Sequence, residues 1–149
     1  MRKALLIGLT LFLLGGCGPS GQVKTYPVKG VVKFDGKPMV GGGSISLIPL
    51  ADQPGKTAAG IIGPDGTYVL ETYKAGDGSM AGEFRVAIFQ ETVKEGKAAP
   101  DGSAPSATAT TIVPLADRIP AVYGDDKSSP LTAKVETKPN VIDFDLKRQ

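Results

Sequence analysis

The sequence predicts an all-β fold, a single seven-stranded sandwich that follows an N-terminal signal-peptide helix. Short runs alternate apolar and polar residues, and turn residues separate these runs every eight to twelve positions. The 149 residues include 20 Gly and 12 Pro, which is typical of a turn-rich chain. Beyond the N-terminal segment no stretch keeps a 3.6-residue apolar period over three turns, so we expect no long helix there.

Four of the expected strands lie in the first half of the chain. Residues 26–34 carry mostly apolar side chains at the even positions, and the DGKP turn at 35–38 ends this strand. A second strand covers 44–49 and ends at a proline. The third and fourth, 57–62 and 67–73, stand on either side of a tight GPDG turn.

Three more strands are expected in the second half of the domain, which we place at 26–147. Residues 84–89 alternate, and 131–136 and 142–146 alternate on either side of a Lys-Pro-Asn turn, which predicts a final hairpin. Between them, residues 92–118 contain no aromatic side chain and are rich in Ala, Ser, Thr and Pro, so we expect a flexible surface insertion. The expected core contains Val32, Phe34, Leu47, Tyr68, Leu70, Phe84, Val86, Ile88, Ile142 and Phe144.

The first seventeen residues have the layout of a signal peptide. A positive MRK start precedes an apolar run that ends in Leu14, Gly15, Gly16 and Cys17. As a helix, residues 4–17 would span about 21 Å, less than the ~30 Å hydrocarbon core of a bilayer, so we do not expect a permanent membrane span. The LGGC run resembles the lipobox of bacterial lipoproteins, in which a branched residue and two small residues precede an acylated cysteine.

The lipobox resemblance implies that residues 1–16 are cleaved and that Cys17 carries acyl chains such as palmitate, with 17–25 as lipidated cysteine and tether. We therefore expect an exported chain held at the membrane by its lipid anchor. Gly18 stands where an inner-membrane retention signal would have Asp, which favours the outer membrane. The alternative is an ordinary signal peptide with an incidental cysteine, which would leave an unpaired thiol in an oxidising compartment.

Several segments of the mature chain, in order, resemble small bacterial lipoproteins with a carboxypeptidase regulatory-like domain, which is a transthyretin-like, immunoglobulin-like β-sandwich. They are VKGVVKFDGKPMVGGGSISLIP at 28–49, GPDGTYVL at 63–70, GEFRVAI at 82–88 and IPAVYGDDKSSPLTAKVETKPNVIDFDL at 119–146. The resemblance implies an accessory module without an established activity of its own. Transthyretin-fold enzymes that hydrolyse hydroxyisourate use histidines and a C-terminal YRGS motif, whereas this chain has no histidine and ends in DLKRQ, which excludes that activity.

Composition narrows the function further. The chain has no His, no Trp and one Cys, so it can form neither an internal disulfide nor a thiolate metal cluster, and we expect no cofactor. Of 17 basic residues two lie in the signal peptide, which leaves 15 against 15 acidic residues in the mature chain. Without a basic excess, nucleic acid is not an expected partner.

Carboxylates are the remaining source of catalytic or metal chemistry. Asp143 and Asp145 lie two apart on one expected strand, about 7 Å from each other, but alternating acids are also typical of a solvent-facing edge strand. Asp77, Asp125 and Asp126 could offer oxygens to calcium, yet their spacing does not match an EF-hand loop, and solvated turns are the simpler interpretation. Serines without a histidine or a Ser-x-x-Lys pattern lack a base. We therefore predict no metal site and no catalytic residues.

The alternation along two strands places four large side chains on the solvent face: Val69, Tyr73, Arg85 and Phe89. Large side chains on a solvent face indicate a ligand-binding face. One interpretation is that the insertion or the tether packs over Tyr73 and Phe89. The other is recognition of a glycan or peptide, with an aromatic platform and with Arg85 as a donor fork for a carboxylate.

Three functional hypotheses follow. The first is a lipid-anchored, non-catalytic cell-envelope module that binds a protein, peptide or glycan. The second is a structural or assembly-supporting lipoprotein without a separate ligand, and the third, a minor one, is a carboxylate-based hydrolase.

Overall fold

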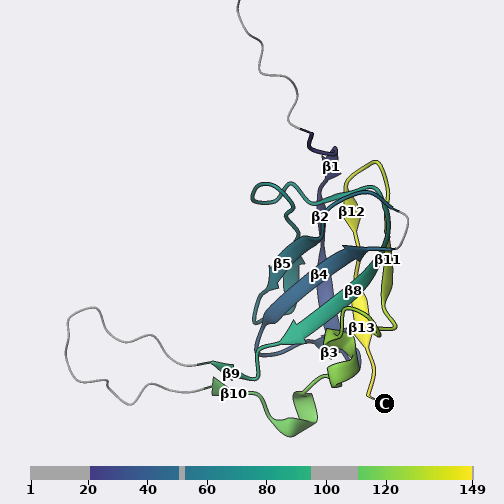
Figure 1. Cartoon of the computed structure of the whole chain (residues 1–149). Helices are drawn as coiled ribbons and strands as arrows, with labels where there is room; N and C mark the ends of the chain where they lie inside the picture. The colour runs from purple at the N-terminus through teal and green to yellow at the C-terminus, as the bar shows by residue number, and fades with distance from the viewer. Residues whose placement is uncertain (1–20, 51–52, 95–110, 149) are drawn as a thin grey trace, which may run out of the picture.

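The computed structural model describes residues 21–50, 53–94 and 111–148 (Figure 1). The predicted signal peptide, the lipobox-like residues Leu14, Gly15 and Gly16, and the acylation candidate Cys17 lie outside the described residues. Within the described ranges, no helix has the length and apolar character needed to span a bilayer.

The all-β fold class is confirmed. The described residues form thirteen strands and two short 3₁₀ helices, most of the strands shorter than six residues. In chain order they are β1 (Thr25–Tyr26), β2 (Val28–Phe34), β3 (Lys37–Pro38), β4 (Gly43–Pro49), β5 (Ala58–Ile62), β6 (Thr67–Val69), β7 (Ser79–Met80), β8 (Gly82–Gln90), β9 (Val93–Lys94), β10 (Thr111–Ile112), η1 (Leu115–Asp117), η2 (Ala121–Gly124), β11 (Thr132–Val135), β12 (Asn140–Val141) and β13 (Phe144–Leu146).

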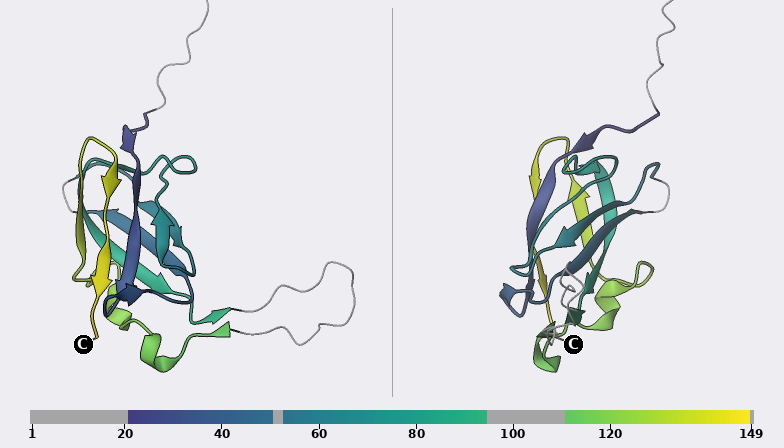
Figure 2. Two further views of the ribbon diagram at one scale, coloured as in Figure 1. Left: turned by 180° about the vertical axis from the view of Figure 1, so that it is seen from behind. Right: turned by 90° about the vertical axis from the view of Figure 1, so that its left-hand side faces the viewer.

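Nine strands form one sheet, which curls into a sandwich (Figures 1 and 2). The strand order is β11-β8-β4-β5-β6-β2-β12, and β13 and β3 also pair with β2. The central strands β4 and β8 run antiparallel, from Gly43 opposite Gln90 to Pro49 opposite Phe84. The β5–β6 hairpin then leads into the second layer, where β6 pairs with β2. The count is nine rather than seven because the short β3 and β12 are added, and the last expected strand, 142–146, corresponds to β13.

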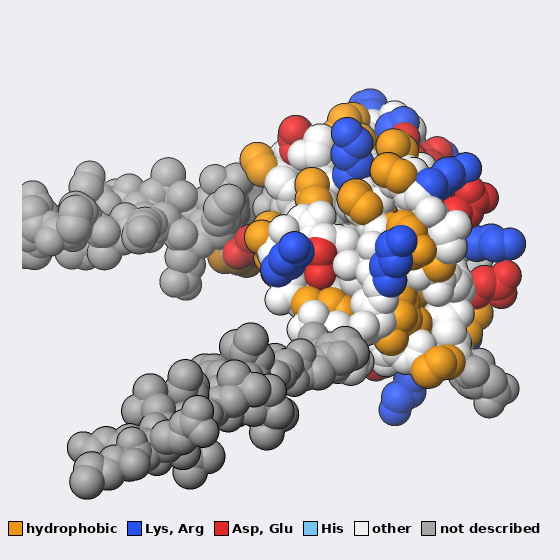
Figure 3. Space-filling model, turned by 90° about the horizontal axis from the view of Figure 1, so that it is seen from above, with side chains coloured by type: hydrophobic (Ala, Val, Ile, Leu, Met, Phe, Trp, Pro, Cys, Tyr) orange, Lys and Arg blue, Asp and Glu red, His pale blue; other side chains and the backbone are white. Residues whose placement is uncertain are grey.

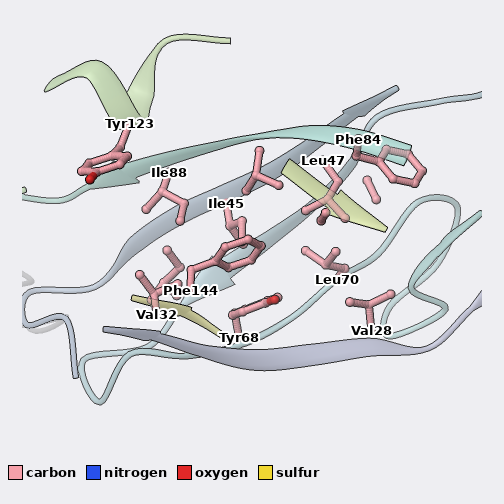
Figure 4. Close-up of a cluster of buried hydrophobic side chains, with 14 of the residues drawn as sticks. Val28, Val32, Ile45, Leu47, Tyr68, Leu70, Phe84, Ile88, Tyr123 and Phe144 are labelled. Atoms are coloured by element: carbon pink, nitrogen blue, oxygen red, sulfur yellow. The ribbon is translucent and has the colours of Figure 1, made fainter. Parts of the chain in front are cut away.

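The core lies between the two layers (Figure 4). Alternation along each strand sends every second side chain inward, and Figure 4 shows the side chains of β4 and β8 facing those of β2. Nine of the ten expected core residues are buried, and the tenth, Ile142, is half-buried and packs against the others. The parity predicted from the sequence therefore holds in all the long strands.

The expected final hairpin is wrong. β11 pairs with β8, whereas β12 and β13 pair in parallel with β2 at the opposite edge of the sheet. The turn between β11 and β12 connects one layer to the other, and the two strands on either side of it do not pair with each other. Asn140 holds this turn: its side-chain oxygen accepts the Glu136 N–H at 3.0 Å, and its amide donates to the Glu136 carbonyl at 3.1 Å.

The break between β12 and β13 has a specific partner on β2. The Ile142 carbonyl points toward Gly30, where a Cβ atom would lie only 1.8 Å from that oxygen. The Tyr68 hydroxyl donates to the same carbonyl at 2.6 Å, and the Val31 N–H donates to the Asp143 carboxylate at 2.9 Å. The last strand bends at this point because a glycine leaves room for its backbone and a buried tyrosine binds it.

The two ends of the 92–118 insertion are more ordered than expected. Its first residues form β9, which pairs with β10. Val113 is buried and lies against Gly41, and its N–H donates to the Thr92 carbonyl at 2.9 Å. Gln90 secures the following stretch, because its buried amide binds the backbone at Val40, Asp117 and Ile119. The rest of the insertion, 95–110, lies outside the described residues.

Candidate functional site

Three large apolar side chains project to solvent in one line across the outer face of the sheet. Ser44 on β4 lies opposite Phe89 on β8 and also opposite Ile61 on β5. The Ile62–Tyr68 pair places Ile61 opposite Val69 on β6. Phe89, Ile61 and Val69 keep 65%, 78% and 54% of their surface exposed, and they are called the apolar row below. The row spans four adjacent strands, about 14 Å at the usual strand spacing.

The apolar row alternates with shallow hollows. A groove of about 530 Å³ lies beside Ile61 and Val69, and its charged lining residue is Glu71. A second hollow, of about 330 Å³, lies between Ile61 and Phe89 and is lined by Glu91 and the glycines 41–43. Apolar ridges separated by hollows are the shape that an extended partner segment with spaced apolar side chains would fit.

Short residues produce the hollows. On the outer face of β4, β5 and β8 the positions next to the row are occupied by Ser44, Ser46, Ala59 and Ala87, which cannot fill the space between larger neighbours. Gly41 and Gly42 have φ values of 87° and 78°, in the left-handed region that favours glycine, so the adjoining loop also lacks side chains.

Arg85 shares the outer face of β8 with Phe89 but does not join the row. The two positions are four residues apart along the strand, about 13 Å. The Arg85 guanidinium donates to the Lys127 carbonyl, and its Nε is buried without a hydrogen-bond partner among the described residues. Arg85 was predicted to donate to a ligand carboxylate with a free guanidinium. In the structure this guanidinium already binds a loop of its own domain, which conflicts with that role.

Tyr73 lies elsewhere, at the end of the sandwich that carries β1. Its hydroxyl accepts the Val23 N–H at 3.1 Å, and the Lys56 ammonium stands 5.3 Å from its ring centre. The strand expected at 67–73 stops at Val69, and Asp77 instead accepts the N–H groups of Thr72 and Tyr73. Of the four residues of the predicted face, the structure brings only Val69 and Phe89 into one row. The tether packs on Tyr73, as one interpretation expected, whereas Phe89 remains exposed.

The candidate acid pair takes part in backbone hydrogen bonds. Asp143 binds the Val31 N–H, and Asp145 accepts the Gly36 N–H at 3.0 Å and pairs with Lys147 at 2.5 Å. The Lys147 ammonium and then the Gly36 N–H lower the pKa of Asp145 below its ordinary value. Both carboxylates thus fasten the last strand to β2 and its turn, and for Asp145 a role as general acid would need the opposite pKa shift.

The acids considered for calcium are turn residues. The Asp125 carboxylate accepts the Lys127 N–H at 2.8 Å and that of Ser128 at 3.3 Å, and these bonds lower its pKa. Desolvation raises the pKa of Asp77, but the hydrogen bonds from Thr72, Tyr73 and Lys74 outweigh it and the pKa is lowered. Across 21–50, 53–94 and 111–148, no three His, Cys, Asp or Glu residues are grouped closely enough to hold a metal ion.

Ile61 was absent from the predicted binding face. Its signal was present in the sequence, because β5 buries Ala58, Gly60 and Ile62 and the same parity sends Ile61 outward. Its place beside Phe89 depends on the order of strands in the sheet, which the alternation within a strand does not specify.

Comparison of the chain with protein-family models, with curated proteins and with solved structures finds no match. Fold and surface are therefore the observations from which a function can be inferred.

Proposed function

We propose that the chain is a lipid-anchored, non-catalytic module of the cell envelope, which binds a protein, peptide or glycan partner on the apolar row. The proposal includes the kinship with carboxypeptidase regulatory-like lipoproteins, acylation of Cys17 and export, with the outer membrane as the favoured location. The anchored part of this proposal is supported by the MRK start, the apolar run and the LGGC motif.

The observation that carries the binding role is the apolar row itself. Single exposed hydrophobic residues are common on protein surfaces and need no explanation. Three in one line across four neighbouring strands, each more than half exposed and with hollows between them, form an apolar surface of the kind that marks interaction sites. Glu71 and Glu91 at its edges favour a partner segment that combines apolar and basic groups.

The non-catalytic role is supported by how the acids are used. Asp77, Asp125, Asp143 and Asp145 all accept backbone N–H groups of their own turns and strands. A carboxylate that acts as a general acid needs a raised pKa and access to substrate, whereas the pKa of Asp77, Asp125 and Asp145 is lowered.

A row variant tests the binding role. Ile61, Val69 and Phe89 are changed together to Thr, which is β-branched and keeps strand propensity. We expect capture of membrane partners by the anchored protein, measured by cross-linking and pull-down, to fall at least about 30-fold, because the loss of even one central apolar contact costs about 2 kcal/mol. The thermal midpoint should stay close to that of the wild type, because the three side chains are exposed.

The matched control changes three exposed hydrophobic residues outside the row, Val40, Leu115 and Val141, to Thr. This variant should capture the same partners as the wild type. Equal capture by wild type, row variant and control would show that the apolar row is inert and would favour a structural lipoprotein without a separate ligand.

A further inference from the structure

We propose that the end of the sandwich carrying β1 faces the membrane, and that Lys24, Lys56 and Lys74 there bind anionic lipid headgroups. The inference rests on the proposed acylation of Cys17 and names a second contact between the anchored domain and its membrane. Figure 3 shows this end of the molecule, where Lys and Arg side chains stand among hydrophobic ones, with Asp and Glu side chains also present on the same face.

The length of the tether restricts where this end can lie. The Val23 N–H is bound by the Tyr73 hydroxyl, so the chain is already attached to the domain at this residue. Six residue steps separate Cys17 from Val23, and they reach about 20 Å even when fully extended. An acylated Cys17 would therefore hold the β1 end near a headgroup layer that is itself about 5–8 Å thick.

Two of the three lysines are held in place by tyrosines. The Lys24 ammonium stands 5.3 Å from the centre of the Tyr26 ring, and Lys56 stands at the same distance from Tyr73. Such cation–π contacts keep both ammonium groups at this end without neutralising them. Tyrosine is also the kind of side chain that settles at the membrane–water boundary.

Lys24 and Lys74 flank a hollow at the root of the tether. This hollow has a volume of about 510 Å³ and is lined by Val23, Tyr73 and Asp77 as well. It is wide enough for a headgroup phosphate, and two of its lining residues are lysines. The Tyr73 hydroxyl and the backbone of the tether provide its polar wall.

The balance of charge at this end favours an anionic partner. Within the described residues, no carboxylate lies within ion-pair distance of Lys24, Lys56 or Lys74. Asp77 keeps its charge while it accepts the N–H groups of Thr72 and Tyr73, and it interacts electrostatically with Lys74. Glu136 pairs with Lys138 at 2.5 Å, so the three lysines outnumber the acid beside them. Each unpaired lysine near an anionic bilayer raises the affinity for the bilayer about fivefold. Three lysines together therefore raise this affinity about 100-fold.

The test attaches the domain to vesicles chemically. Residues 17–149 are coupled through the Cys17 thiol to a maleimide lipid, in vesicles of phosphatidylcholine with or without phosphatidylglycerol. A gadolinium-chelate lipid broadens the amide NMR signals of residues near the bilayer. We expect the signals of 22–26 and 71–78 to broaden more with phosphatidylglycerol than without it, and those of the opposite end to stay sharp.

Charge reversal identifies the groups responsible. The variant with Lys24, Lys56 and Lys74 changed to Glu should lose the phosphatidylglycerol-dependent broadening. A control with Lys33, Lys37 and Lys127 changed to Glu carries the same charge away from β1 and should keep it. Broadening that does not depend on phosphatidylglycerol, or that persists in the first variant, would overturn the proposal. Because the coupling supplies the anchor, neither result depends on whether a cell acylates Cys17.

Discussion

At Gly30 the absence of one methyl group decides how the last strand runs. The backbone of Ile142 occupies the space that a Cβ would need, and the Tyr68 hydroxyl holds that backbone from the other side. In the sequence, Gly30 is noticeable only as the one residue without a side chain among the apolar even positions of its strand. Its role depends on a segment more than a hundred residues away.

Gly30→Ala should therefore destabilise the domain. Because the methyl group would lie 1.8 Å from the Ile142 carbonyl oxygen, the β2–β12 pairing must shift, at a cost of about 1–3 kcal/mol or more. Urea unfolding followed by circular dichroism measures the change. Gly21→Ala is the control, since no atom lies within 4 Å of its added methyl group, and it should unfold like the wild type. Equal midpoints for both variants would show that β2 and Ile142 are not in close contact.

Cys17 carries the anchored half of the proposed function. Wild-type chain expressed with radiolabelled palmitate should incorporate label and sediment with membranes, because LGGC resembles the lipobox at which lipoproteins are acylated. Cys17→Ala should incorporate no label. Equal labelling of the two proteins would eliminate this residue as the acylation site.

Among the elements, the clearest difference from expectation is the pairing of the last two strands. The alternation in 131–136 and 142–146 correctly predicted which side chains face the core. It could not predict the pairing, because a hairpin and a parallel strand added to β2 show the same alternation. Asn140 and Gly30 select the second arrangement, one by closing the turn and the other by admitting the Ile142 backbone.

The insertion is also best treated as an element with ordered ends. We expect replacement of 95–110 by an Asn-Gly turn to leave the thermal midpoint within a few degrees of the wild type. Lys94 lies opposite Thr111 in the β9–β10 register, so a two-residue turn can close the hairpin, and closure of a long loop contributes little free energy. Differential scanning calorimetry measures the midpoint. A large loss of stability would mean that residues 95–110 contribute to the packing of the domain.

For the whole molecule, the surface carboxylates predict a loss of stability in acid. The pKa of Asp125 and that of Asp145 are both lowered in the folded chain, by bonds from Lys127 and Ser128 and from Lys147 and Gly36 respectively. A group whose pKa is lowered on folding stabilises the fold above its unfolded pKa of about 4, and this contribution is lost as the pH falls through the folded value.

Urea midpoints measured at neutral pH, at about pH 5 and at about pH 3 should therefore decrease mainly over the last interval. A variant with Asp125 and Asp145 changed to Asn should start lower at neutral pH and lose less on acidification. A wild-type midpoint that is unchanged down to about pH 3 would show that these bonds contribute no stability.

By itself the sequence determined the all-β class, the faces of the long strands and nine of the twenty buried hydrophobic residues among those described, because burial follows a local period of two residues. It also defined the candidate anchor, because a signal peptide and lipobox are linear motifs. Only the tertiary structure decided which outward residues become neighbours. The order of the strands places Phe89 in one row with Ile61 and Val69, whereas Tyr73 lies with the tether at the β1 end. Strand order and register arise from contacts between distant segments, and no local pattern encodes them.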